Sequence, residues 1–516
     1  MRVKPFKNES ITDFSVKSNL LKQQKALASV GKKLGKTNEM VVAGKKLRSK
    51  DKLFTYNPSN KNEVVAKFYK STKDIAVKAV EAAAKKFEEW RFVPAEERAR
   101  YLFRAAALAK KKRFEINAWM IYETGKNFVE ADADTAEAID FLEFYGREIL
   151  RYSSKQPLTP VKGESNELVY IPLGVGISIP PWNFPFAILV GMTSAAVVSG
   201  NTVVLKPSSD SPMMGKVFFD IMKEAGLPDG VINFLPGSGS EVGDTLVSHP
   251  KVRFISFTGS MAVGTHIYEL ASKVQPKQIW LKRVVAEMGG KDCIIVDKET
   301  NIDDAVKGVV TSAFGFQGQK CSACSRVIVD KVIYSKFVSK LKKAVEKIEV
   351  GPGAENYPVG PVINQAAEKS ILNYIKIGKK EGKLLVGGSK AKGNGYYINP
   401  TVITDIKPTD RLAQEEVFGP ILVVIKSNNF EQSLKIANNT IYGLTGSVYT
   451  RNPKKQEVAK KHLLIGNLYF NRKCTGALVG GHPFGGFNMS GTDSKAGGRD
   501  YLLLFLQAKL MSAKVK

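Results

Sequence analysis

Cysteine and histidine are scarce in this chain. Each occurs four times among 516 residues, which is too few for the disulfide scaffold of a small secreted protein. Cys321 and Cys324 form a Cys-x-x-Cys pair that could be half of a zinc site or a redox pair, but Cys293 and Cys474 stand alone in the sequence. We therefore expect a reduced, cytoplasmic protein that holds no metal.

The sequence also shows no long apolar run and no visible signal peptide. The most apolar stretch, residues 184–198, is interrupted by Pro185 and Gly191 and is shorter than the roughly 20 residues that span a bilayer. The first residues lack the apolar core of a signal peptide. We interpret the apolar stretch as a buried core helix and expect a soluble protein with no membrane partner.

Acidic residues are few compared with basic ones. The chain has 77 Lys and Arg against 49 Asp and Glu, a net charge of +28, which invites a nucleic-acid interpretation. Residues 174–264, however, hold five basic and six acidic side chains, and no segment of the sequence clusters basic with aromatic residues. We interpret the excess as a solvated surface that binds polyanions non-specifically at low salt, and expect no specific nucleic-acid partner.

The sequence does contain alternating strand and helix patterns, in a chain long enough for one large α/β enzyme or about three domains. Helices are predicted first at 94–124 and 128–150. Strands then alternate with helices, with strands at 169–179, 202–206, 231–235 and 253–258 and helices at 186–199, 211–225, 241–248 and 261–273. Such βαβ units form a parallel sheet that binds ligands at the carboxyl ends of its strands. A second α/β region follows from about 289 to 470, with a helix at 335–347, and 499–513 is a β-like tail.

Three short segments carry candidate binding residues. Asn183, in Pro-Trp-Asn-Phe-Pro, follows a predicted strand and can point its amide into a cleft. Lys206, at the end of the next strand, can meet a ribose or phosphate. The small residues from Phe257-Thr-Gly-Ser260 to Gly264 begin a predicted helix and suit a pyrophosphate. Each segment by itself is more often structural than functional.

A fourth segment, Gly318-Gln-Lys-Cys321, offers a nucleophile. A nucleophilic cysteine needs a partner that stabilises its thiolate or later activates water. Glu287, in Glu-Met-Gly-Gly290, is a candidate general base.

These motifs, in this order and together with Glu416-Val-Phe-Gly-Pro420, resemble the aldehyde dehydrogenase superfamily over nearly the whole chain. The resemblance implies an α/β fold with a Rossmann-like NAD-binding domain, an α/β catalytic domain and a small β oligomerisation flap. The implied boundaries are 1–150 and 170–288 for the first domain, 289–485 for the second, and 151–169 and 486–516 for the flap. It also implies a homodimer or a higher homo-oligomer.

The resemblance further implies roles for single residues. Cys321 would be the nucleophile, the Asn183 amide and the Cys321 N–H would hold the oxyanion, and Glu287 would activate water. Residues implied at the cofactor are Glu416 on the nicotinamide ribose, Lys206 on the adenosine ribose, Ser260 on the pyrophosphate, Phe418 near the nicotinamide, and Trp182, Gly259, Gly264 and Ser209. Because position 209 is Ser rather than Glu, NADP remains possible beside the expected NAD.

A narrower likeness concerns the substrate. The segments around Cys321, Thr475-Gly-Ala477 and His482 to Gly498 resemble the stand-alone bacterial enzymes that oxidise L-glutamate γ-semialdehyde, formed from 1-pyrroline-5-carboxylate, in proline and arginine breakdown. This likeness implies a carboxylate anchor at Ser322, Gly476 and Ala477, and a sandwich of the methylene chain between Phe184 and Phe487. Glu137 would bind the ammonium, unless it is a solvated helix carboxylate.

Several alternatives remain open from the sequence. The chain could oxidise another short semialdehyde, transfer an acyl group to coenzyme A, or bind polyanions without catalysis on this fold. It could also be catalytically silent. Cys324, one helical turn from Cys321, could form a mixed oxidation product with it, but is expected to pack near the site as a structural residue.

Overall fold

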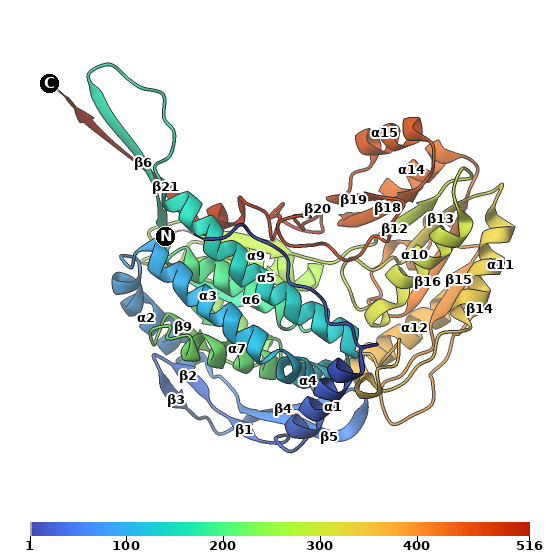
Figure 1. Ribbon diagram of the computed structural model, residues 1–516, viewed down its shortest axis with the longest axis horizontal. Coiled ribbons are helices and arrows are strands. Elements are labelled where there is room, and N and C mark those ends of the chain that lie inside the picture. Colours follow the sequence, from blue (N-terminus) through green and yellow to red (C-terminus); the bar gives the residue numbers. More distant parts are fainter. Residues whose placement is uncertain (1–2, 516) are drawn as a thin grey trace.

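The computed structural model describes residues 3–515, which form two lobes that each contain a seven-stranded sheet (Figure 1). The sheet of the first lobe carries residues up to 287, and the sheet of the second lobe begins at residue 293. Both sheets are combined with helices, so the expected α/β fold class is confirmed.

The first sheet is parallel at its centre. Its strands run in the order β11 (Arg283–Glu287), β10 (Val252–Thr258), β7 (Val175–Ile179), β8 (Thr202–Leu205), β9 (Ile232–Phe234), β2 (Met40–Val42) and β3 (Lys45–Leu47). The pairs from β11 to β9 are parallel, whereas β2 and β3 are antiparallel additions from the N-terminal part of the chain. Four of the five parallel strands, β7 to β10, correspond to ranges that the sequence predicts as strands, and β11 was not predicted.

Helices cover both faces of this sheet and bury its apolar side chains. One buried cluster joins the strands to α2 (Lys73–Trp90), α8 (Asp244–Ser248) and α9 (Met261–Ser272). The other joins them to α3 (Ala95–Lys111), α5 (Phe128–Ser153), α6 (Ala187–Val198) and α7 (Pro212–Glu224), with α1 (Lys17–Gly31) and α4 (Arg113–Thr124) beside them. Most side chains of these strands are therefore apolar on both faces, as expected for strands buried on both faces.

The helices begin and end close to where the sequence predicts them. Pro94 precedes α3 and acidic residues occupy its first turn, and Asn127 caps α5 by accepting the N–H of Glu130. Two predictions need correction. The segment 241–248 is α-helical only as α8, because Gly239–Gly243 forms a π-helical turn. The segment 169–179 is two strands in different sheets, since Gly174, at φ 144°, breaks the run after Pro172.

The second sheet is also mostly parallel. Its order is β14 (Lys383–Val386), β15 (Thr401–Thr404), β16 (Ile421–Ser427), β13 (Arg326–Asp330), β12 (Cys293–Val296), β18 (Thr445–Tyr449) and β19 (Asn467–Phe470), with only the β14 pair antiparallel. Helices α10 (Ile302–Phe314) and α11 (Tyr334–Val345) cover one face. The other face packs against α12 (Gln365–Glu381), α13 (Arg411–Gln414), α14 (Phe430–Asn438) and α15 (Pro453–His462).

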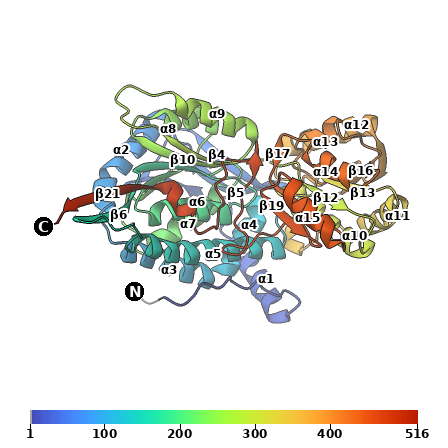
Figure 2. The same ribbon diagram turned by 90° about the horizontal axis from the view of Figure 1, so that it is seen from above.

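A two-stranded ribbon extends from the first lobe. Strand β6 (Glu164–Pro172) pairs antiparallel with β21 (Leu506–Lys514) over their whole length, and the ribbon projects beyond the helices in both views (Figures 1 and 2). The chain just before β21 does not project. Its Tyr501 stacks on Tyr145 of α5 at 5.5 Å between ring centroids, in the turn Tyr501–Phe505. A short pair, β17 (Tyr442–Gly443) with β20 (Phe487–Asn488), links the C-terminal segment to the second lobe.

A small outer sheet brings basic and aromatic residues together, although the sequence predicts no such cluster. Its strands are β1 (Thr37–Asn38), β5 (Asn60–Tyr69) and β4 (Lys52–Asn57). The basic and aromatic residues are not clustered in one segment, but strand pairing brings them together. The exposed positions of β4 alternate as Lys52, Phe54 and Tyr56, and Lys67 of β5 lies over the Phe54 ring. Lys52 lies over the ring of Tyr69.

Among the described residues, no helix is both long enough and apolar enough to cross a membrane.

Candidate active site

The candidate catalytic residues come together from distant parts of the chain. Glu287 is the last residue of β11, Asn183 follows β7, and Cys321 lies in a turn before β13. The Asn183 amide donates to the carbonyl of Gln319 at 3.0 Å, which ties the first lobe to the segment that carries the cysteine. The three side chains therefore share one site although 138 residues separate the first from the last.

Cys321 is a partly exposed thiol in a segment of unusual backbone. Phe316 and Gln317, in the 3-10 turn before it, both have left-handed φ, at 50° and 57°. Burial raises the pKa of the Cys321 thiol well above its usual value, and the carboxyl groups of Asp292, Glu416 and Glu287 raise it further. The thiol is therefore neutral at rest, and the nucleophile has to lose a proton during the reaction.

Glu287 is a carboxyl group whose environment suits a general base. Burial raises its pKa to about 8, while a hydrogen bond from Ser494 and the charge of Lys495 oppose that shift. The Ser494 hydroxyl donates to Oε1, whereas Oε2 is buried and accepts no hydrogen bond among the described residues. A carboxyl group that titrates near neutral pH can take a proton from water and release it again.

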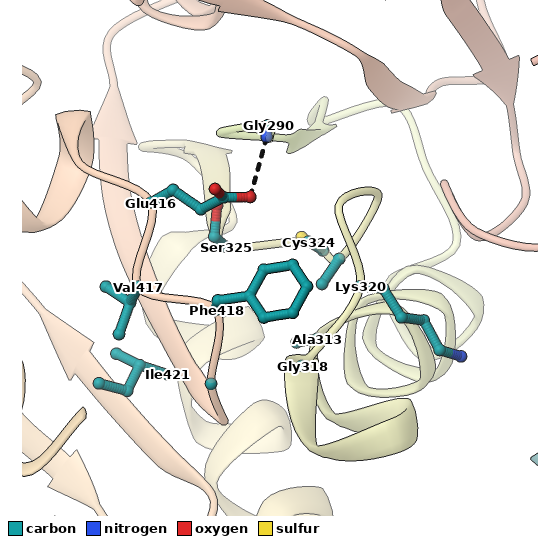
Figure 3. A pocket seen from close by; sticks show the side chains of 12 residues that line it. Gly290, Ala313, Gly318, Lys320, Cys324, Ser325, Glu416, Val417, Phe418 and Ile421 are labelled. Carbon is teal, nitrogen blue, oxygen red and sulfur yellow. Dashed lines mark hydrogen bonds between the residues drawn. The ribbon is translucent and has the colours of Figure 1, made fainter. Parts of the chain in front are cut away.

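Glu416 approaches the backbone of the Glu-Met-Gly-Gly segment closely. Its Oε1 accepts the N–H of Gly290 at 3.0 Å (Figure 3). A Cβ at Gly289 would clash with the same carboxylate, and one at Gly290 would lie 2.5 Å from the carbonyl of Cys321. The two glycines are thus required for the second lobe to approach this segment so closely. Burial raises the pKa of Glu416 to about 7.

The carboxyl end of β8 carries two of the expected cofactor residues. Lys206 is buried, and its Nζ donates only to the carbonyls of Pro207 and Gly237, both at 3.1 Å, among the described residues. Ser209 donates to the same Gly237 carbonyl at 3.2 Å. Burial lowers the pKa of Lys206 to about 8. A buried ammonium with two weak acceptors is suited to a hydroxyl-rich ligand such as a ribose.

The expected pyrophosphate segment lies at the start of α9. Ser260 is exposed and caps the helix by accepting the N–H of Val263 at 3.4 Å. Gly259 donates to the carbonyl of Glu287 at 3.0 Å, and Gly264, one turn on, packs against Met288. The helix N-terminus therefore lies next to the strand that carries Glu287, where its amides suit an anion.

Two aromatic rings form a contact between the lobes. Trp182 meets Phe418 edge to face, with 5.5 Å between the ring centroids. Phe418 has a left-handed φ of 56°, which directs it out of the loop that carries Glu416 (Figure 3). The two rings thus join the lobes, and their place beside the cofactor stays a prediction.

The expected carboxylate anchor is partly formed. Ser322 is buried beside Cys321, and the N–H groups of Gly476 and Ala477 make no hydrogen bond within residues 3–515. Cys474, just before that loop, donates from Sγ to the carbonyl of Ser322 at 3.4 Å, which brings the two parts of the anchor together. Free amides and a hydroxyl are donors that suit a carboxylate, and their convergence on one stays a prediction.

The expected sandwich residues lie in different surroundings. The ammonium of Lys126 lies over the ring of Phe184, 4.3 Å from its centroid. Phe487 is 38% exposed, and Lys495 lies over it at 5.6 Å. That the two rings enclose a substrate chain stays a prediction.

Glu137 is not the solvated helix carboxylate that was its alternative interpretation. It is half-buried, and burial followed by the charge of Asp134 raises its pKa to about 8, while Lys126 and Lys320 oppose this. No hydrogen bond of its carboxyl group is found among the described residues. A buried carboxyl group of this kind gains most from a cationic partner.

Sequence reasoning missed two ion pairs that involve acidic residues of α5. Lys126 and Asp134 pair at 2.6 Å with both side chains fully buried. Lys320, the neighbour of Cys321, pairs with Glu130 at 3.0 Å. The acidic residues that recur on the buried side of α5 were the available signal, because such residues are rarely buried without partners.

The expected position of Cys324 is wrong in one respect. Residues 321–325 form a turn and then irregular chain rather than a helix, so the two cysteines are not related by a helical turn. Cys324 is buried and lies beside Cys474, which is isolated only in the sequence. Burial, and then the hydrogen bond with Cys474, raises the pKa of Cys324. This burial is consistent with the structural role expected for it.

Comparisons with known proteins bear on the whole chain. The family model described as the aldehyde dehydrogenase family matches residues 46–511. The 1-pyrroline-5-carboxylate dehydrogenases of Geobacillus kaustophilus (strain HTA426) and Anoxybacillus flavithermus (strain DSM 21510 / WK1) are 51% and 52% identical over 511 residues, 99% of this chain and of each relative. A crystal structure of 1-pyrroline-5-carboxylate dehydrogenase from Thermus with bound NAD has a TM-score of 0.98 at 48% identity and covers 100% of both chains.

Proposed function

The chain belongs to the aldehyde dehydrogenase family, and from this premise we propose that it oxidises L-glutamate γ-semialdehyde, the open form of 1-pyrroline-5-carboxylate, to L-glutamate. The observation that carries the proposal is the convergence of Cys321, Asn183 and Glu287 beside an anchor of free N–H groups. Relatives half identical over their full length carry this enzyme's name.

The reaction begins at Cys321. Its thiol loses a proton, and the sulfur attacks the aldehyde carbon to form a thiohemiacetal whose oxygen is negative. One amide hydrogen of Asn183 is donated to the Gln319 carbonyl. The other is free to donate to the thiohemiacetal oxygen, together with the N–H of Cys321. Such a donor stabilises the transition state by about 3–4 kcal/mol.

Glu287 acts in the second half of the reaction. Lys206, Ser260 and Glu416 would hold NAD, which would supply the hydride acceptor needed to turn the thiohemiacetal on Cys321 into a thioester. Glu287 then takes a proton from water, the hydroxide attacks the thioester carbon, and the sulfur leaves as the thiolate. The net change consumes aldehyde, NAD⁺ and water and yields the acid, NADH and a proton.

The residues present fit a dinucleotide. Lys206 is a buried cation without a carboxylate partner among the described residues, Ser260 begins α9, and Glu416 lies at the other end of the site. We assign these residues to the adenosine ribose, the pyrophosphate and the nicotinamide ribose. Ser209 offers a hydroxyl rather than a carboxylate beside the first ribose, so a 2′-phosphate is not repelled there and NADP is a second acceptor to test.

The anchor explains the choice of an amino-acid aldehyde. Ser322, Gly476 and Ala477 would donate to the α-carboxylate, and Glu137 would accept from the ammonium. A simple aldehyde such as propanal has neither group and would leave both parts of the anchor unused. Succinate semialdehyde has a carboxylate but lacks the ammonium.

The chain would assemble with copies of itself. Apolar side chains are exposed along α9 and the chain that follows it, including Tyr268, Ile279 and Leu281. The β6–β21 ribbon exposes Leu510 and Met511 in the same way. We assign the ribbon and α9 to the subunit contact, the first sheet to the dinucleotide and the second to catalysis. Light scattering would measure the oligomer.

The test is reduced-cofactor formation from pyrroline-5-carboxylate with NAD or NADP and without coenzyme A, with succinate semialdehyde and propanal as competitors. Preference for the five-carbon amino-acid aldehyde supports the proposal. Equal or better turnover of the simpler aldehydes would be consistent with the family but would contradict the proposed substrate. A requirement for coenzyme A would contradict hydrolysis by Glu287.

The outer sheet favours a second candidate function, polyanion binding. Its exposed face alternates Lys52 and Lys67 with Phe54 and Tyr56, the residue types that contact single-stranded nucleic acid. Binding that persists at physiological salt and weakens in Phe54→Ala would support it. A steep loss with salt, unchanged in that variant, would mark the affinity as incidental.

A further inference from the structure

We propose that Ser494 is a positioning residue that holds Glu287 ready to activate water and sets the pH range in which it does so. The proposal rests on the role of Glu287 in the proposed function. None of the motifs that identify the family assigns a role to Ser494, which lies 207 residues from Glu287 in the sequence.

The backbone aligns the two residues. The segment 490–492 runs along the end of β11: Met288 donates to the carbonyl of Ser490 at 2.8 Å, and Thr492 donates to the carbonyl of Ala286 at 2.9 Å. Glu287 and Gly491 form a β-bridge between these contacts. The chain is thereby held beside Glu287 and delivers Ser494 to its carboxyl group two residues later.

The backbone around Ser494 is unusual in a way that serves this contact. Asp493 and Lys495 both have left-handed φ, at 55° and 43°, although neither is glycine. Such a conformation is unfavourable for these residue types and persists where the surroundings impose it. Between them, the Ser494 side chain turns inward, is 4% exposed, and donates its hydroxyl hydrogen to Oε1 of Glu287.

The other charged and titratable groups around Glu287 do not make the contact that Ser494 makes. Lys495 lowers the pKa of Glu287, Asp493 raises it, and Tyr501 and Cys321 also respond to the Glu287 charge. The Lys495 ammonium is engaged by the carbonyls of Gly466 and Gly485, at 2.6 and 2.7 Å, rather than by the carboxylate. The Ser494 hydroxyl is therefore the side-chain donor that contacts Glu287 directly.

This contact has a definite direction of effect. A hydroxyl that donates to a carboxylate favours the charged form, so it opposes the rise of pKa that burial causes. Without it, the pKa of Glu287 rises further and less of the group is ionised at a given pH. The same bond fixes Oε1, while Oε2 is buried and has no hydrogen-bond partner among the described residues.

The experiment compares the pH profile of kcat in wild type, Ser494→Ala, Ser494→Thr and Thr492→Val, with pyrroline-5-carboxylate and NAD. We expect Ser494→Ala to move the acidic limb up by about half to one pH unit, with KM unchanged. Ser494→Thr, which keeps the hydroxyl, restores the wild-type limb. Thr492→Val removes a hydroxyl from the same segment that contacts only the backbone of Ala286, and lowers stability without moving the limb.

The outcomes separate this proposal from the proposed function. An acidic limb in folded Ser494→Ala that coincides with wild type overturns the role of Ser494, and so does an equal shift in Thr492→Val. Neither result affects the proposed function, which the activity of the wild-type protein tests by itself. A wild type inactive on every aldehyde would overturn that function, and with it the role of Ser494.

Discussion

The two lobes present opposite ends of their sheets to the site. In the first lobe, Lys206, Ser260 and Glu287 come at or directly after the carboxyl ends of β8, β10 and β11. In the second lobe, Cys321 and Glu416 each precede a strand by five residues, and the strands begin at Arg326 and Ile421. The rule that ligands bind at carboxyl ends therefore holds for one lobe and fails for the other.

The difference follows from what each end of a parallel strand offers. A carboxyl end leads into a helix N-terminus, which attracts the anionic parts of a dinucleotide. An amino end leaves N–H groups free, and here Asp292 satisfies some of them by accepting from Thr445, at 2.7 Å to Oδ1, and from Ser325, at 3.1 Å to its carbonyl. This difference supports our proposal that the first lobe holds the cofactor and the second carries the nucleophile next to backbone donors.

Cys321→Ala should give the largest difference between the two lobes, because it removes the reacting atom of the second lobe and leaves the first lobe intact. We expect aldehyde oxidation to fall by at least about 10⁴-fold, since no covalent intermediate can form. NAD affinity, measured by calorimetry, should stay within about twofold. A large loss of NAD binding would contradict the division between the lobes.

Glu287→Gln removes the base that the first lobe supplies. We expect steady-state turnover to fall by about 100-fold or more. Stopped-flow absorbance should still record a burst of NADH of up to one equivalent per subunit, because the thioester forms before water is needed. Loss of the burst as well would mean that Glu287 also removes the proton from Cys321.

Asn183→Ala removes the donor that bridges the lobes. We expect kcat to fall by about 100-fold with little change in KM, because the oxyanion exists only after attack by sulfur. The bond to Gln319 is lost too, so the melting temperature should be measured alongside. A rise in KM without a change in kcat would argue that Asn183 binds substrate rather than the transition state.

The pH dependence gives the smallest expected effect. Glu287 acts as a carboxylate, and its pKa is raised to about 8, so the rate should fall as the pH drops below about 8. The decrease approaches tenfold per pH unit. Steady-state rates across the pH range, at constant ionic strength, measure this limb. A flat profile in wild type, or the same limb in Glu287→Gln, would assign the titration to another group.

Much of the first lobe was predictable from sequence, because its strands are short apolar runs between turn residues and its helices carry local caps. Residues 202–206 and 253–258 were predicted as strands and fold as β8 and β10 with nearly the same bounds. Predictions failed where neighbours decide the structure. Pro172 and Gly174 mark the break between β6 and β7, but no local pattern assigns these strands to different sheets or makes the segment after Cys321 non-helical.

The sequence by itself determined the order of the motifs, the βαβ pattern and the residue types able to do the chemistry. These properties depend on near neighbours and on the alternation of apolar and polar side chains. The tertiary structure alone decided that Ser494 meets Glu287, that Lys126 pairs with Asp134, and that Cys474 lies beside Cys324. Contacts between residues far apart in the chain form only when whole sheets and helices pack, and no local pattern encodes them.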